Sequence, residues 1–152
     1  MIIRRCRSED IERVQRIEAL SLENPWSVRL FQEELQISGS RLWVAELDGQ
    51  IQGFASFRIC APECELLRLA VAPSARRAGI GRDLLAQACR CLFDEGCTTC
   101  FLEVRQSNAA ARSLYERAGF IHDGCWARYY NNPVEDAMLY SLNMVTRQGV
   151  LH

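Results

Sequence analysis

The apolar and polar positions of the chain change period several times, and each change marks a new element. Alternation with a period of two, rich in β-branched and aromatic residues, is typical of half-buried strands. Seven segments show this pattern: 2–5, 41–47, 51–59, 65–71, 98–104, 120–130 and 135–144. Turn residues at 48–50 and 131–133 predict that two pairs of these strands form hairpins.

Four other segments repeat apolar residues every three or four positions, which predicts helices. Their apolar positions are Ile11, Val14, Ile17 and Leu20; Leu30, Phe31 and Leu35; Ile80, Leu84, Ala88 and Leu92; and Ala111, Leu114, Tyr115 and Ala118. The expected N-caps are Ser8, Ser27 and one of Ser107 and Asn108. Gly96 and Gly119 are expected to end the last two helices.

The predicted order of elements is β-α-α-β-β-β-α-β-α-β-β, which indicates an α+β fold with a mixed sheet. The 152 residues are 49% hydrophobic and 24% charged, as in an ordinary globular domain. We therefore expect one domain over residues 1–146 and a short C-terminal tail over residues 147–152.

Charge and hydropathy exclude several classes of protein. A net charge of -1 argues against a protein that binds nucleic acid through bulk electrostatics. No apolar run approaches the roughly 20 residues that span a bilayer. The polar start of the chain has no apolar core of a secretion signal, so we expect a cytoplasmic protein.

Eight cysteines are many for a chain of this length. Cys97 and Cys100 have the spacing of a zinc or redox pair, but the sequence has no second such pair and only two histidines. Reduced thiols that pack as small hydrophobes are the favoured interpretation, and we expect no metal site. The sequence leaves open whether the cysteines have a redox role.

The stretch RLAVAPSARRAGIGRDLL, residues 68–85, predicts an anion-binding loop. A strand ends at Val71, Pro73 directs the chain off the sheet, and two glycines precede a helix. Glycines let backbone amides approach a phosphate, and the helix N-terminus adds unpaired N–H groups and partial positive charge. A third glycine and a Gly-Lys-Ser/Thr sequence are both missing, which argues against a dinucleotide fold and a nucleotide-triphosphate loop.

This stretch resembles the coenzyme A motif of the Gcn5-related N-acetyltransferases (GNAT), and the order of elements is similar to theirs. The segments NPWS (24–27), LEVRQSNAAARSLYERAGF (102–120) and RYYNNPVEDAML (128–139) resemble the RimI group of ribosomal-protein-alanine N-acetyltransferases. The resemblance implies a twisted, mostly antiparallel sheet of about seven strands with about four helices. It also implies that the fourth and fifth strands splay apart to admit acetyl-CoA.

The resemblance assigns roles to residues on both sides of that gap. The coenzyme contacts it implies are Leu69, Ala70, Val71, Arg76, Arg77, Ala78, Gly79, Ile80, Gly81, Arg82, Asn108 and Tyr115. A backbone N–H near Leu69 or Val71 would face the thioester oxygen, where negative charge develops.

Two residues are implied to move protons. Glu103 matches the general base, although a carboxylate at a strand end is more often simply solvated. Glu63 and Glu65 are second candidates for that step, through a water relay or by binding a basic peptide. Tyr115 matches the acid that protonates the leaving thiolate; the alternative is a tyrosine of the core.

The resemblance also implies which residues recognise the acceptor. Trp26, Tyr129 and Tyr130 are implied to shape the acceptor groove, although the two tyrosines are as compatible with ordinary strand positions. The RimI acceptor is the N-terminal alanine of a small-subunit ribosomal protein with a basic start. Acidic residues that would suit such a tail are Glu63, Glu65, Glu135 and Asp136, of which the last two are also suited to cap a turn.

The chain departs from the RimI pattern at a few positions. Arg68 stands where asparagine is common, and Cys125 and Trp126 stand where a basic residue is usual. Acetylation of a lysine or of a small-molecule amine therefore remains an alternative. So does a coenzyme A-binding subunit without catalysis, although the presence of both Glu103 and Tyr115 argues against it.

Overall fold

The computed structural model describes residues 1–145, so the tail predicted at 147–152 lies outside the described residues. Seven strands form one sheet in the order β1-β2-β3-β4-β5-β7-β6. All neighbouring strands are antiparallel except β4 and β5, which are parallel. The strands are β1 Ile2–Arg5, β2 Ser40–Leu47, β3 Gln50–Cys60, β4 Glu63–Val71, β5 Thr99–Arg105, β6 Ile121–Tyr130 and β7 Glu135–Asn143. The predicted α+β fold and mixed sheet are confirmed.

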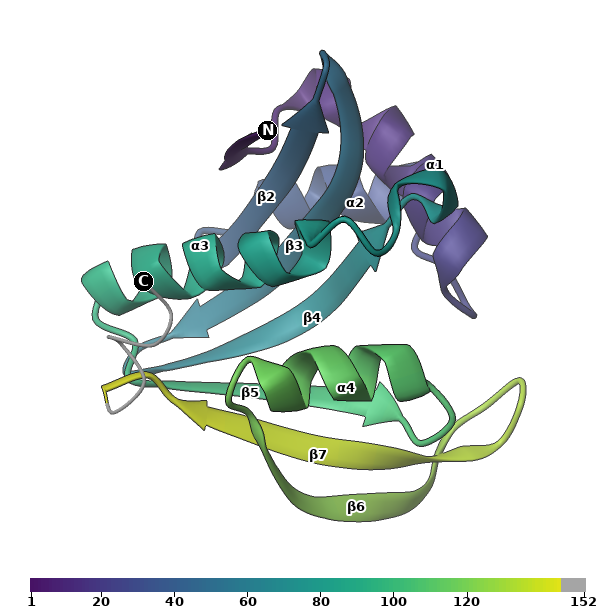
Figure 1. Ribbon diagram of the computed structural model, residues 1–152, viewed down its shortest axis with the longest axis vertical. Helices are drawn as coiled ribbons and strands as arrows, with labels where there is room; N and C mark the ends of the chain where they lie inside the picture. Colours follow the sequence, from purple (N-terminus) through teal and green to yellow (C-terminus); the bar gives the residue numbers. More distant parts are fainter. Residues whose placement is uncertain (146–152) are drawn as a thin grey trace.

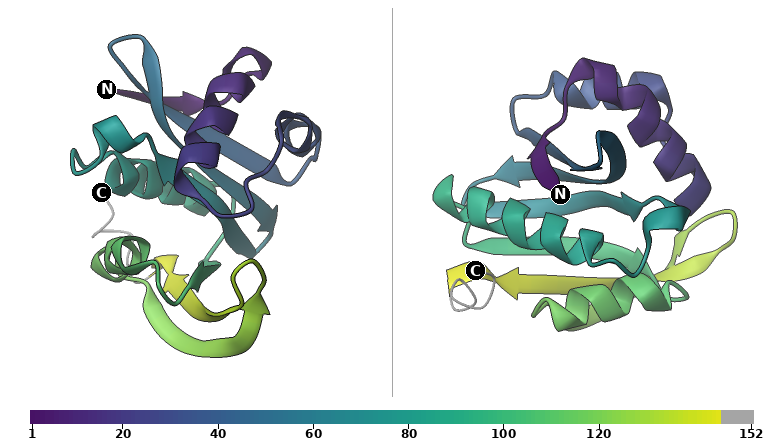
Figure 2. Two further views of the ribbon diagram at one scale, coloured as in Figure 1. Left: turned by 90° about the vertical axis from the view of Figure 1, so that its right-hand side faces the viewer. Right: turned by 45° about the horizontal axis from the view of Figure 1, so that its top comes forward.

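Four α-helices cover the two faces of the sheet (Figure 1). They are α1 Ile11–Ser21, α2 Val28–Leu35, α3 Ile80–Asp94 and α4 Ala109–Arg117. Helices α1 and α2 lie on one face, and α3 and α4 lie on the other (Figure 2). Each pair buries its own apolar cluster, and the larger cluster lies between the sheet and α3 and α4. None of these helices is long and apolar enough to span a bilayer.

Helix starts agree with the predicted caps at two places and differ at a third. The Ser27 hydroxyl accepts a hydrogen bond from the Leu30 N–H at 3.1 Å, and the Asn108 carbonyl oxygen accepts one from the Ala111 N–H at 3.1 Å. Ser8 is not a cap, because residues 8–10 form a 3₁₀ turn before α1. The Asp10 carboxylate instead accepts the Arg7 N–H at 2.8 Å, which stabilises this turn.

The apolar face predicted for α1 is wrong at its last turn. Leu20 is 67% exposed, whereas Glu18 is fully buried at 0%. Periodicity alone favours the leucine, but a carboxylate is retained in the interior when cationic and N–H partners stabilise its charge. Glu18 has such partners, and they belong to the site described below.

Strands β4 and β5 separate along their length (Figure 1). Their paired register runs from Glu63 opposite Thr99 to Leu66 opposite Leu102 and then stops, although β4 continues to Val71 and β5 to Arg105. The edge of β4 beyond Leu66 is therefore open toward β5. Open strand edges carry unpaired N–H and C=O groups, so this gap is suited to hold an extended ligand.

A β-bulge at Leu67 shifts the alternation of β4. Phe57 of β3 lies opposite Leu66 and Ser56 lies opposite Arg68, which leaves Leu67 without a partner. Leu66 consequently faces α3 while Arg68, two positions later, faces α1 and α2. The bulge is a feature that the alternation of the sequence did not reveal.

Candidate active site

The predicted phosphate loop has a backbone that presents N–H groups. Arg77 and Gly79 have φ values of 65° and 80°, in the left-handed region. The first hydrogen bond of α3 runs from the Asp83 N–H to the Gly79 carbonyl, at 3.0 Å. The N–H groups of residues 80–82 therefore have no acceptor within the helix, as expected of an anion site.

Glycine is required at positions 79 and 81 of this loop for different structural reasons. Gly79 needs its left-handed conformation, and a Cβ there would lie 2.8 Å from the Arg82 guanidinium. Gly81 has ordinary helical geometry, but a Cβ there would lie 3.3 Å from Leu114 of α4 and 3.8 Å from Leu69 of β4. The loop thus fits an anion that needs close backbone approach.

The three arginines of the loop are not equally free. The Arg76 guanidinium donates to the Val71 carbonyl at 3.2 Å and to the Ser21 hydroxyl at 3.0 Å, so it ties the loop to β4 and α1. Arg82 has a loose contact of 3.4 Å with Asp83, and its side chain is 72% exposed. Arg77 is also exposed. Arg77 and Arg82 are therefore better placed than Arg76 to reach a phosphate.

The open edge of β4 continues directly into this loop. Ala70 is buried against the cluster of α1 and α2, while the side chains of Leu69 and Val71 pack toward α3. The backbone of all three residues lies beyond the last pair with β5. These predicted contacts therefore line the gap with backbone groups rather than with polar side chains.

Tyr115 lies on the face of the sheet that α3 and α4 cover. Its ring is 6% exposed and packs against Phe120 at 5.8 Å and Tyr140 at 6.4 Å between centroids. Burial raises the pKa of its hydroxyl well above the usual value. The contacts given for this side chain within residues 1–145 are ring packings, so its hydroxyl is available to donate to a ligand.

Glu103 lies on the opposite face of β5, since its neighbours Leu102 and Val104 face α3 and α4. Tyr129 lies close to Glu103, and interaction with that carboxylate raises the pKa of the Tyr129 hydroxyl. Glu65 of β4 is close by: burial, and then the charge of Glu103, raise the pKa of its carboxyl. Two carboxylates and a tyrosine therefore meet on this face.

Tyr130 lies beside the same group. Burial, and then the charges of Glu103 and Tyr129, raise its pKa to about 12. The Arg105 guanidinium lies over its ring, 4.5 Å from the centroid. The structure thus brings Tyr129 and Tyr130 together with Glu103.

The other acidic candidates differ in position. Glu63 is exposed at the closed end of the β4–β5 pair, two positions further from the gap than Glu65. Glu135 forms an ion pair with Arg105 at 3.2 Å and accepts the Ser107 N–H. Asp136 accepts the Arg128 N–H at 2.9 Å. Glu135 and Asp136 were candidates either to bind a basic tail or to cap a turn, and these contacts agree with the second role.

The sequence did not predict a cluster on the same face, formed by Glu18, Arg68 and Trp26. Arg68 lies 3.1 Å from Glu18 and has its guanidinium 4.8 Å from the centroid of the Trp26 ring. The backbone N–H of Trp26 donates to the Glu18 carboxylate. One feature of the sequence could have indicated this cluster. Glu18, near the end of α1, and Arg68, within β4, are charged residues in segments whose periodicity predicts burial.

The eight cysteines are all free thiols. Cys64, Cys89, Cys97 and Cys100 are buried together in the larger core cluster. Within residues 1–145, no group of three or more cysteine, histidine or acidic side chains is arranged to hold a metal ion.

Comparison with known proteins identifies the family. Residues 11–120 match the profile of the acetyltransferase (GNAT) family. The chain is 34% identical over 137 residues to the ribosomal-protein-bS18-alanine N-acetyltransferase of Escherichia coli, covering 88% of this chain and 90% of that protein. The crystal structure of the Escherichia coli ribosomal-protein-S18-alanine N-acetyltransferase superposes with a TM-score of 0.86 at 32% identity, over 93% and 92% of the two chains. Ard1 from Thermoplasma volcanium gives a TM-score of 0.87 at 25% identity, over 93% and 96%. The chain therefore belongs to the acetyltransferase (GNAT) family and is an N-acetyltransferase.

Proposed function

We propose that the protein transfers an acetyl group from acetyl-CoA to the N-terminal alanine of a small-subunit ribosomal protein, by direct attack of the amine on the thioester. One observation carries the proposal: the gap between β4 and β5 has Glu103 on one face and Tyr115 on the other. A donor bound along the gap would lie between a base and an acid. The bS18-specific name of the relative from Escherichia coli supports the choice of acceptor.

The donor would extend from the loop before α3 along the open edge of β4. The N–H groups of residues 80–82, with Arg77 and Arg82, would hold its pyrophosphate. The backbone of residues 69–71 would pair with its pantetheine arm, and the free amide of Asn108 would contact the same arm. A backbone N–H near Leu69 or Val71 would donate to the thioester oxygen as negative charge develops there.

The acceptor amine must lose a proton before it attacks. A free α-amino group has a pKa near 8, so at neutral pH roughly nine-tenths of it is protonated. Glu103 would accept this proton, directly or through water, and Glu65 is placed to assist. Attack and departure of the thiolate would then need no covalent bond to the enzyme.

The leaving thiolate would take a proton from Tyr115. Burial keeps this hydroxyl protonated at neutral pH. The same low-dielectric surroundings disfavour a thiolate formed there, which favours proton transfer to the sulfur. The amine nitrogen would gain the acetyl group and lose two protons: one to Glu103 before the attack, and one as the tetrahedral intermediate collapses. The second proton would pass, directly or through water, to Tyr115 and restore the hydroxyl that protonated the sulfur.

The acceptor would enter from the face that carries Trp26, Tyr129 and Tyr130. Glu65 lies within this face and Glu63 at its margin, and their charges complement a basic peptide. Opposite charges at the rim of a site mainly accelerate encounter, so they favour basic tails over acidic ones. Glu135 and Asp136 are occupied by their own partners and contribute little to this preference.

A two-peptide assay tests the proposal. The protein is mixed with acetyl-CoA and with either a basic peptide that has a free N-terminal alanine or an N-blocked peptide with an internal lysine. Mass spectrometry then locates the acetyl group. Acetylation of the alanine is expected; acetylation of the lysine alone would replace the acceptor, and no turnover on either peptide would favour a coenzyme-binding protein without catalysis.

A further inference from the structure

Arg68 is a charged residue within the opened part of β4, and the proposed mechanism leaves it without a role. It directly follows the bulge at Leu67, so its side chain faces the acceptor side of the sheet. Its Nη2 donates to the Asn24 carbonyl at 3.0 Å and to Glu18 at 3.4 Å. Its side chain is 21% exposed, so part of it reaches solvent at the acceptor face.

The guanidinium of Arg68 is held in one orientation. Glu18 is fully buried, and its carboxylate lies 3.1 Å from the Arg68 Nε in an ion pair without aligned hydrogen-bond geometry. The Trp26 ring stacks below the guanidinium plane. A planar cation with contacts on its face and on one edge has little rotational freedom, so its remaining edge is a fixed donor.

That remaining edge includes Nη1. Within residues 1–145, Nη1 has no hydrogen-bond partner. The positive charge of Arg68 is close enough to Tyr130 to lower the pKa of its hydroxyl, against the larger effect of burial. The Asn24 residue whose carbonyl accepts from Arg68 also donates from its side-chain amide to the Asn131 carbonyl at 3.2 Å, directly after Tyr130. Arg68 therefore lies near the tyrosine pair that lies beside Glu103.

We propose that Arg68 is an acceptor-positioning residue that donates from Nη1 to the carbonyl oxygen of the acceptor's first residue. This deepens the proposed function and rests on it. In a peptide N-terminus, that carbonyl carbon is bonded to the same Cα as the attacking amine. A lysine side-chain amine has no carbonyl at this distance. A fixed donor beside the amine site thus selects α-amines over side-chain amines, because the side-chain amine leaves the donor unpaired.

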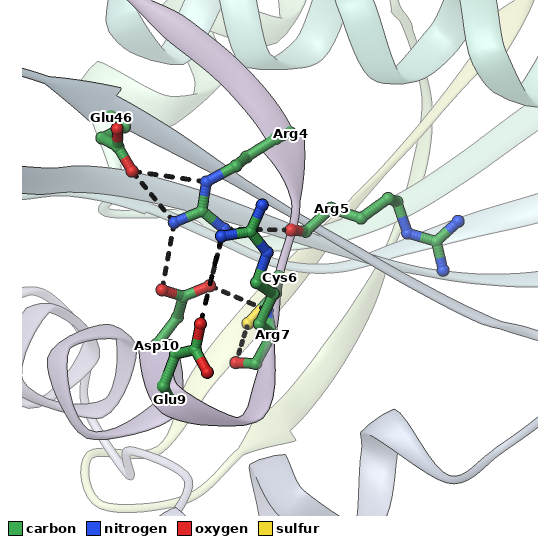
Figure 3. Close-up of polar contacts among 7 residues, drawn as sticks. All are labelled: Arg4, Arg5, Cys6, Arg7, Glu9, Asp10 and Glu46. Atoms are coloured by element: carbon green, nitrogen blue, oxygen red, sulfur yellow. Dashed lines mark hydrogen bonds and ion pairs between the residues drawn. The ribbon is translucent and has the colours of Figure 1, made fainter. Parts of the chain in front are cut away.

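A merely structural role for the Glu18–Arg68 pair needs its own control. The network of Arg4, Asp10 and Glu46 supplies one (Figure 3). Arg4 is 19% exposed and lies 2.8 Å from Asp10, whose side chain is 7% exposed. This pair therefore matches the Glu18–Arg68 pair in chemistry and burial, but it joins β1 to the turn before α1 and lines a polar hollow formed by that end of the chain.

The test compares Arg68→Lys and Arg68→Asn with the control Arg4→Asn. Steady-state kinetics give kcat, the KM for the alanine-start peptide and the KM for acetyl-CoA. Lysine retains a positive charge beside Glu18 but has no second nitrogen to replace the proposed Nη1 donor. Arg68→Lys therefore still tests the proposal if Arg68→Asn does not fold. Both Arg68 variants should raise the peptide KM roughly ten- to a hundredfold, as expected for loss of a charge-assisted hydrogen bond. The KM for acetyl-CoA should stay within about twofold.

The lysine peptide supplies the second readout. Where wild-type protein acetylates it, its kcat/KM should fall less than about threefold in Arg68→Lys, so the preference for the α-amine shrinks. An unchanged peptide KM in Arg68→Lys, or an equal rise in Arg4→Asn, would overturn the proposal. A wild-type protein that acetylates no peptide would instead overturn the proposed function, since the Arg68 comparison starts from measurable wild-type turnover.

Discussion

Replacing Gly79 by alanine separates the conformational role of this glycine from its proposed role in donor binding. The residue has a φ of 80°, in a region where a Cβ crowds the backbone. Its new methyl group would lie 2.8 Å from the Arg82 guanidinium, which must move away. The substitution therefore strains the loop and displaces one of the two free arginines.

The expected loss of stability follows from the geometry. Left-handed backbone costs a residue with a Cβ about 1–2 kcal/mol. The smaller conformational freedom of alanine in the unfolded chain offsets about 0.4–1 kcal/mol of this. The net loss is about 1 kcal/mol, which lowers Tm by roughly 2–4 °C in a domain of this size. The exposed Arg82 side chain swings aside at little further cost.

Gly49 provides a matched control. Its φ is 78°, and nothing lies within 4 Å of a Cβ built there, in the turn between β2 and β3. Thermal unfolding should therefore show similar losses for Gly79→Ala and Gly49→Ala, while only Gly79→Ala raises the KM for acetyl-CoA, by about tenfold. Equal KM values in the two variants would refute the assignment of this loop to the donor phosphates.

Three further variants or measurements test the chemistry and the core. Glu103→Gln should lose rate mainly at neutral pH, and the deficit should shrink about tenfold between pH 7 and pH 9 as the α-amine loses its proton unaided; a deficit constant in pH would contradict a base. Tyr115→Phe should lower kcat about a hundredfold with little change in the KM for acetyl-CoA, whereas equal changes in both would indicate packing alone. A thiol reagent should modify the exposed Cys60 and Cys125 quickly in native protein, and fast reaction of the buried thiols would contradict the described core. Those thiols are Cys64, Cys89, Cys97 and Cys100.

The sequence predicts the helices and strands of this fold well, because their periodicities are long and regular. The hairpin at Asp48 and Gly49 is an example: left-handed φ values of 52° and 78° fit the turn that these residue types favour. The start of α1 was harder. Ser8 is a good cap by residue type, but Asp10 stabilises this turn instead, because its carboxylate accepts hydrogen bonds from both the Arg7 backbone N–H and the Arg4 guanidinium.

The proposed acceptor face was predictable only in part. Glu103, Tyr129 and Tyr130 follow from a motif, and the structure places them together. Arg68 and Glu18 are fifty positions apart, and nothing local in the sequence pairs them. Their contact depends on Leu67, the extra residue in β4. The alternation of apolar and polar residues does not reveal this extra residue, because another leucine precedes it and an arginine follows it.

The bulge at Leu67 shifts the alternation of side chains between the two parts of β4. Before the bulge, Leu66 faces α3; after it, Leu69 does so, three positions later rather than two or four. Deleting Leu67 would leave these directions unchanged, because Leu66 and Arg68 already lie opposite consecutive residues of β3. A regular strand that kept Leu67 in the ladder would instead point Arg68 into the apolar cluster beneath α3 and Leu69 toward the opposite face. The bulge therefore absorbs one residue of the sequence, and the side of the sheet on which Arg68 lies depends on that absorption.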